Sequence, residues 1–166
     1  MKRKTVLVVE DDAIVRSDIC ERLRDRALDT LEAANETEAL RMIRSAAKQV
    51  DVALIDVCLP LRASRRAVDR SYGRRSGLRV ARIIRDRYPN TRLIGMSQFA
   101  DEEVRSWCAE YGSGFLPKSW LFRGAAADFV DAVEHCARKR YRKRKPRTFV
   151  VHGQDNPAFL SLLTFI

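Results

Sequence analysis

The side chains in this sequence that could most readily bind a ligand or take part in a reaction are acidic, hydroxyl and lysine residues. Each of them follows a short apolar run. Glu10 and Asp11 follow one run, and Asp56, Ser97 and Lys118 each follow another. In an open parallel α/β sheet, ligands bind just beyond the carboxyl ends of the strands, so we expect these side chains to converge. Neighbouring carboxylates repel one another unless a hard cation lies among them, and Mg²⁺ with oxygen ligands meets that need.

The surrounding sequence supplies elements that would position these residues. Short apolar runs alternate with amphipathic stretches, which is typical of a parallel sheet with helices on both faces. The chain length suits one compact domain with a short extension. We predict strands near 5–9, 29–33, 52–56, 92–97 and 114–117, and helices near 13–27, 35–47, 77–88, 101–112 and 123–141.

Two helices carry more specific signals. Asp12 is expected to begin the first helix, where the helix dipole favours a carboxylate. Asn35 is expected to cap the second helix, with Glu38 as its reciprocal partner. Within the first helix, the periodicity predicts a buried stripe of Ile14, Ile19 and Leu23, and a solvent-facing set of Arg16, Glu21, Arg22 and Arg24.

Three segments together resemble a known family. They are Val-Leu-Val-Val-Glu-Asp-Asp at 6–12, Leu-Ile-Asp-Val-Cys-Leu-Pro at 54–60 and Gly-Phe-Leu-Pro-Lys-Ser at 114–119. In type, order and spacing they resemble the CheY-like receiver domain of two-component response regulators, over about residues 4–140. The resemblance implies an α/β fold with a doubly wound five-stranded parallel sheet, the flavodoxin-like (βα)5 receiver, with strand order 2-1-3-4-5.

The resemblance also implies roles for the clustered residues. Asp56 is expected to accept a phosphoryl group, which Lys118 and Ser97 then contact, and Phe115 occupies the position of the aromatic switch. Mg²⁺ is the expected cofactor. Its expected ligands are Asp11, Asp56, Glu10 through water, and the backbone carbonyl of Cys58.

Three positions depart from the family pattern. Gln98 stands where a small residue is usual, and its longer side chain is expected to slow access to the acceptor. Ser119 replaces the proline that commonly follows the lysine, so we expect no cis peptide after Lys118. Phe115 lacks the hydroxyl with which a tyrosine switch would form a hydrogen bond.

The net charge of +10 comes from two local segments. Residues 61–76 contain six arginines and one aspartate, in an insertion where the family usually has a tight loop. Two interpretations are open for Arg62, Arg65 and Arg66 in this insertion. They would contact a phosphoryl group or an acidic partner, or they would belong to a solvated loop, and we favour the solvated loop.

Residues 138–147 contain eight basic residues and no acid. This basic run has three possible roles: a linker that extends the last helix, a contact to nucleic acid, or a contact to anionic lipid. We favour the linker.

The remaining composition bears on the compartment. Cys20, Cys58, Cys108 and Cys136 are widely spaced, with no zinc signature and no disulfide framework, which favours a reducing compartment. The start of the chain has no room for a signal peptide, and no apolar stretch is long enough to span a membrane. We therefore expect a cytoplasmic protein.

The last residues suggest a second unit. We divide the chain into a receiver at 1–137, a basic linker or helix extension at 138–147, and an incomplete output domain at 148–166, read as a strand and a short helix. The segment Val-Val-His-Gly-Gln-Asp at 150–155 resembles the start of TIR-like predicted nucleotide-binding domains. Because such a short piece cannot bury its own apolar side chains, we expect it to dock on the receiver or to form a homodimer.

Two functions from different classes follow. The first is a phosphorylation-driven receiver that is not an enzyme, takes its phosphoryl group from a sensor histidine kinase or a phosphotransfer protein, and controls an output domain or partner. The alternative is a nucleic-acid-binding or scaffold module acting through the insertion and the basic run. The first is favoured because every chemically demanding residue is present.

Overall fold

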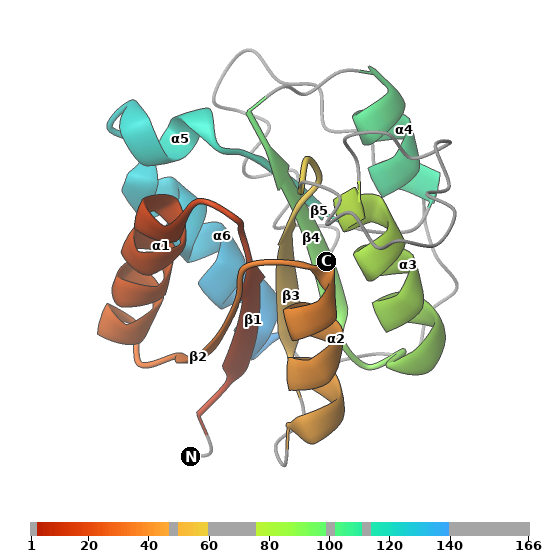
Figure 1. The fold of residues 1–166 in the computed structure, drawn as a ribbon. Helices are drawn as coiled ribbons and strands as arrows, with labels where there is room; N and C mark the ends of the chain where they lie inside the picture. Colours follow the sequence, from red (N-terminus) through yellow and green to blue (C-terminus); the bar gives the residue numbers. More distant parts are fainter. Residues whose placement is uncertain (1–2, 47–49, 60–75, 99–101, 111–113, 140–166) are drawn as a thin grey trace.

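A computed structural model describes residues 3–46, 50–59, 76–98, 102–110 and 114–139 of the protein. Five parallel strands form one sheet in the order β2-β1-β3-β4-β5 (Figure 1). The strands are β1 (Thr5–Val9), β2 (Asp29–Ala33), β3 (Val52–Asp56), β4 (Arg92–Ser97) and β5 (Gly114–Pro117). The helices are α1 (Ala13–Asp25), α2 (Glu36–Ser45), α3 (Ser76–Arg87), α4 (Glu102–Glu110), α5 (Ser119–Phe122) and α6 (Ala126–Arg138). The predicted strands, their bounds and the doubly wound topology are confirmed.

The sheet separates two hydrophobic layers. Successive side chains of a strand point to opposite faces, so each buried strand contributes to both layers. Val6 and Val8 of β1 pack with α1, α5 and α6, whereas Leu7 and Val9 pack with α2 and α3. Figure 1 shows α1, α5 and α6 on one side of the sheet and α2, α3 and α4 on the other. The central strands β1 and β3 are buried along their whole length, as expected for a sheet covered on both faces.

The first helix differs from its predicted pattern at two positions. Ile19 and Leu23 are buried, but Ile14 is 82% exposed. The apolar stripe instead starts at Val15, which packs against the core one helical turn before Ile19. Arg16 does not face solvent freely, because only 17% of its side chain is exposed and it contacts the end of β1.

The helix predicted over 123–141 is shorter in the structure, where it spans Ala126–Arg138, and a short helix that was not predicted precedes it. A four-residue helix, α5, begins directly after Lys118, and α6 begins only at Ala126. The break contains Gly124, whose φ of 77° lies in the left-handed region that glycine adopts at low cost. Leu121 of α5 is buried and Trp120 packs against the α1–α6 layer. The short helix therefore belongs to the core although it has no amphipathic period of its own.

The predicted cap of α2 is confirmed. Asn35 Oδ1 accepts a hydrogen bond from the Glu38 amide at 3.1 Å, and the Glu38 carboxylate accepts from Ala34 N and Asn35 Nδ2. All described peptide bonds are trans, including the one after Lys118. Among the described residues, no helix has the length and apolar character required to cross a membrane.

Several predictions fall on residues that the structure does not describe. They concern the insertion at 61–76 apart from Ser76, the basic run from residue 140, and the segment 148–166 with its TIR-like motif. These expectations stay predictions.

Candidate phosphoacceptor site

Four strand ends meet at the carboxyl edge of the sheet. β1 leads to Glu10, while β3, β4 and β5 lead to Asp56, Ser97 and Lys118. Neighbouring main chains are joined at this edge: Lys118 N donates to Ser97 O at 2.9 Å, and Val57 N donates to Met96 O at 2.9 Å. The parallel register therefore carries the predicted residues to one place, as the positions at the strand ends indicated.

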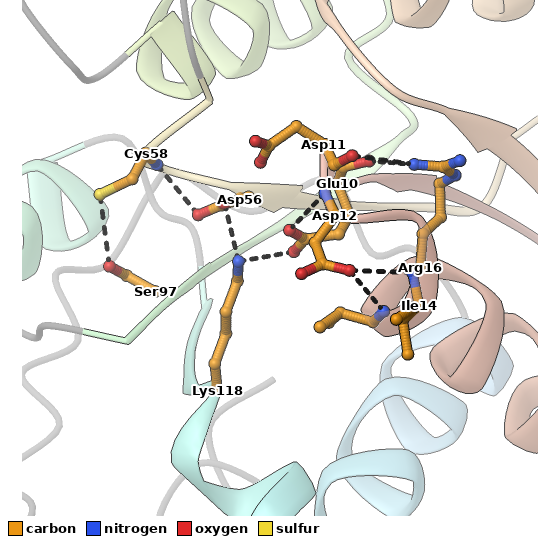
Figure 2. Close-up of polar contacts among 10 residues, drawn as sticks. Glu10, Asp11, Asp12, Ile14, Arg16, Asp56, Cys58, Ser97 and Lys118 are labelled. Carbon is orange, nitrogen blue, oxygen red and sulfur yellow. Dashed lines mark hydrogen bonds and ion pairs between the residues drawn. The ribbon is translucent and has the colours of Figure 1, made fainter.

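The Lys118 ammonium lies between two buried carboxylates (Figure 2). Lys118 Nζ is 2.7 Å from Asp56 Oδ2 and 2.7 Å from Glu10 Oε2. Burial lowers the pKa of Lys118, but the charge of Asp56 and contacts with both carboxylates outweigh it and raise the pKa above its usual value. The lysine is therefore a permanent cation at the centre of the site.

Glu10 is the innermost of the three consecutive acids at 10–12, a point that strand alternation alone left open. It is 1% exposed, whereas Asp11 and Asp12 are exposed. Burial, and then the charge of Asp56, raise the pKa of Glu10 to about 7 against the opposing effect of Lys118. Asp12 caps α1 as predicted, accepting hydrogen bonds from Ile14 N at 2.8 Å and Val15 N at 3.1 Å.

The third carboxylate completes an acidic cluster. Glu10, Asp11 and Asp56 each place one oxygen within 4.8 Å of the others. The Lys118 ammonium contacts two of these carboxylates, and together the four side chains sum to two negative charges when ionised. A divalent cation bound by oxygen ligands would neutralise that excess, so the cluster fits a divalent metal site.

Asp56 is held at both of its oxygens. Oδ1 accepts a hydrogen bond from Cys58 N at 2.9 Å, and Oδ2 accepts from Lys118. Only 3% of Asp56 is exposed. The exposed thiol of Cys58 lies 3.6 Å from the buried Ser97 hydroxyl (Figure 2). The predicted acceptor, hydroxyl and loop residue are therefore neighbours in space.

Two further predicted positions lie beside this cluster. Phe115 is 6% exposed and packs with Val57, Leu78, Val104 and Cys108. Gln98 is exposed directly after Ser97. Phe115 thus occupies an inward, buried position, and the expected effect of Gln98 on access to Asp56 stays a prediction.

Arg16 is a contributor to the site that sequence reasoning missed. Its Nη1 donates to the backbone carbonyl of Glu10 at 2.7 Å, and Nε lies 3.7 Å from Glu32. The contact fixes the end of β1, which carries both acids. The contact was missed because a charged residue on a surface helix is ordinarily solvated. The one sequence signal for it is the position of Arg16, one helical turn after Asp12.

The family follows from comparison with known proteins. Residues 6–124 match the model of the response regulator receiver domain, so the chain belongs to that family. The signal receiver domain of NarL from Mycobacterium tuberculosis has a similar fold, with a TM-score of 0.65 and 24% identity over 84% of this chain and 100% of that chain. The acidic cluster is of the kind found at the phosphoacceptor site of receivers.

Two longer proteins are similar over the same region. The sensor kinase CckA of Brucella abortus is 28% identical over 131 residues, which are 78% of this chain and 12% of that protein. A cyclic di-GMP phosphodiesterase of Thermotoga maritima is 30% identical over 109 residues, which are 66% of this chain and 25% of that protein. The chain thus spans a quarter or less of the length of these relatives.

Proposed function

We propose that Asp56 is the phosphoryl acceptor of this receiver. The observation that carries the proposal is the fixation of its buried carboxylate by Lys118 on one oxygen and by Cys58 N on the other. A carboxylate held this way is oriented before the donor arrives, and positioning is the main contribution that a protein makes to phosphoryl transfer.

The reaction moves one phosphoryl group from a donor histidine. An oxygen of Asp56 forms a bond to phosphorus, the phosphorus–nitrogen bond breaks, and the imidazole leaves with its electron pair and takes up a proton. Lys118 offsets negative charge on the phosphoryl oxygens, and the Ser97 hydroxyl donates a hydrogen bond to one of them. Phe115 and Ser97 then act as the switch, by selecting the conformation that fits the phosphorylated site.

We assign Mg²⁺ to the acidic cluster. Asp11, Asp56 and the backbone carbonyl of Cys58 would hold it directly, and Glu10 would hold it through water. When bound, Mg²⁺ neutralises charge on the transferring group, which a lysine alone does only in part.

The partner is a sensor histidine kinase or a phosphotransfer protein, and we infer a cytoplasmic location from that class of partner. The receiver fold is that of a signalling domain, and we propose that it assists its own phosphorylation and dephosphorylation without a substrate of its own. A receiver at 1–137 ahead of a basic linker at 138–147 fits the family match at 6–124. The alternative of a nucleic-acid-binding scaffold is not favoured, because the family match and the acidic cluster both point to phosphoryl acceptance.

Incubation with acetyl phosphate tests the proposal. Intact-mass measurement should show one added phosphoryl group in the presence of Mg²⁺ and none after chelation. Asp56→Asn should abolish the addition, whereas Asp51→Asn, which alters the surface ion pair with Lys4, should leave it unchanged. An unchanged addition in Asp56→Asn would show that the acceptor is another residue.

A further inference from the structure

The first two residues of α3 contact the loop that follows the proposed acceptor. Gly77 packs so closely against β3 that a Cβ atom at this position would lie 1.8 Å from Asp56 O and 2.9 Å from Val57 Cα. Real Cβ atoms do not approach backbone atoms at such distances, so any side chain at Gly77 must displace the end of β3 or the start of α3.

Ser76 makes a second contact to the same loop. Its Oγ donates to Leu59 O at 2.7 Å, and both residues are almost fully buried, at 2% and 1% exposed. The hydrogen bond joins positions separated by 17 residues in the chain. Loss of this donor costs free energy, because a buried carbonyl then loses a hydrogen bond.

The loop between these contacts determines the geometry of Asp56. Cys58 N, which fixes Asp56 Oδ1, lies between Val57, held by Met96 O, and Leu59, held by Ser76. A shift of this backbone moves the donor to the acceptor carboxylate together with the Cys58 carbonyl that we assign to the metal. Misplacement of reacting groups by about 1 Å is enough to lower a rate about a hundredfold.

We propose that Ser76 and Gly77 are positioning residues for phosphoryl acceptance. They act through residues 56–59, and neither needs to touch the phosphoryl group or the metal. This inference rests on the proposed function, since it names the part of the fold that keeps the acceptor in its reactive geometry.

The test compares three variants with a control glycine. Gly77→Ala should lower the rate of phosphorylation by acetyl phosphate about tenfold to a hundredfold and weaken Mg²⁺ binding, measured by calorimetry, about tenfold. Ser76→Ala should lower the rate about threefold to tenfold, and Ser76→Thr should recover most of that loss because it retains the hydroxyl. Gly124→Ala is the control, because it strains a positive φ while meeting no atom within 4 Å.

A substitution that affects stability alone should give a different pattern of results. Gly124→Ala is such a substitution, so it should lower the melting temperature yet leave both the phosphorylation rate and the Mg²⁺ affinity within about twofold of the unsubstituted protein. Equal rates and affinities for Gly77→Ala and Gly124→Ala would overturn the inference. If Gly77→Ala does not fold, Ser76→Ala decides, and an unchanged rate in that variant would overturn it. Absence of phosphoryl uptake by the unsubstituted protein would instead contradict the proposed function.

Discussion

At the scale of single residues, the site depends on one buried cation shared by two carboxylates. Lys118 is 2.7 Å from both Glu10 and Asp56, and the two acids repel each other when it is removed. Such an arrangement costs stability if one partner is lost, because the remaining charges stay buried without compensation. The same residue thus stabilises the fold and, in the proposed reaction, offsets negative charge on the phosphoryl group.

We expect Lys118→Met to lower the free energy of unfolding by about 3 kcal/mol in the presence of a chelator. The loss should shrink when Mg²⁺ is added, because a bound cation replaces part of the missing positive charge. Lys4→Met provides a matched control: Lys4 forms an ion pair of the same 2.7 Å length with Asp51, but 39% of its side chain is exposed. Its removal should cost at most about 1 kcal/mol. Urea denaturation measures both values, and equal losses would contradict the buried-cation account.

The four cysteines should differ strongly in reactivity. All are free thiols, and Cys58 alone among them is exposed. Burial raises the pKa of Cys108 to about 12 and that of Cys136 to about 11, and burial followed by the charge of Glu32 raises that of Cys20 to about 11. Since the thiolate is the reactive form, brief treatment with iodoacetamide at pH 8 should modify Cys58 first.

Peptide mass spectrometry identifies the modified cysteine. The adduct on Cys58 lies beside Ser97 and Asp56, so the alkylated protein should also take up less phosphoryl group. Cys58→Ser serves as the control, because it should resist brief alkylation and keep its phosphoryl uptake. Initial modification at a buried cysteine would contradict the burial described for these side chains.

At the scale of secondary-structure elements, the strands were predictable and the exact packing of the helices was not. Apolar runs such as Val6–Val9 set the strands, and the parallel topology then placed Glu10, Asp56, Ser97 and Lys118 together. By contrast, Ile14 and Val15 both fit an apolar stripe, and only packing in three dimensions leaves Ile14 exposed. The hydrogen bond from Ser76 to Leu59 joins residues through the tertiary fold, which no local pattern encodes.

The contact between Ser76 and Leu59 also predicts how the insertion behaves. Since these residues are joined by a hydrogen bond, a short Gly/Ser bridge can replace residues 60–75 without separating the flanking backbone. The shortened protein should take up phosphoryl group at a rate within about threefold of the original, because the free-energy cost of closing a loop changes little with its length. A shortened protein that stays folded by circular dichroism but loses uptake would show that the arginines of the insertion serve the reaction.

At the scale of the whole molecule, the described core and the last residues make separate contributions. Arg92 donates to the carbonyls of Cys136 and Lys139 and thereby fixes the end of α6. Beyond this point, the sequence holds apolar residues that must be covered: Phe149, Val150, Val151, Phe159, Leu160, Leu162 and Leu163.

We expect truncation after Lys145 to give a more soluble and more nearly monomeric receiver, because it removes these apolar residues and leaves the described core intact. Phosphoryl uptake should be unharmed. Light scattering measures the molar mass of the particles in solution before and after truncation. The same number of chains per particle in both proteins would exclude association through this segment. Strong, salt-sensitive DNA binding that disappears on truncation would instead support the nucleic-acid alternative.

The central claim is that Asp56 carries the phosphoryl group as an acyl phosphate. Its most direct test is to phosphorylate the protein with acetyl phosphate and Mg²⁺, reduce it with borohydride, and sequence the peptides by mass spectrometry. Borohydride converts a phosphorylated aspartate to homoserine, so the account predicts homoserine at position 56 and unchanged aspartates at positions 11, 12 and 51. Homoserine at another aspartate, with position 56 unchanged, would contradict it.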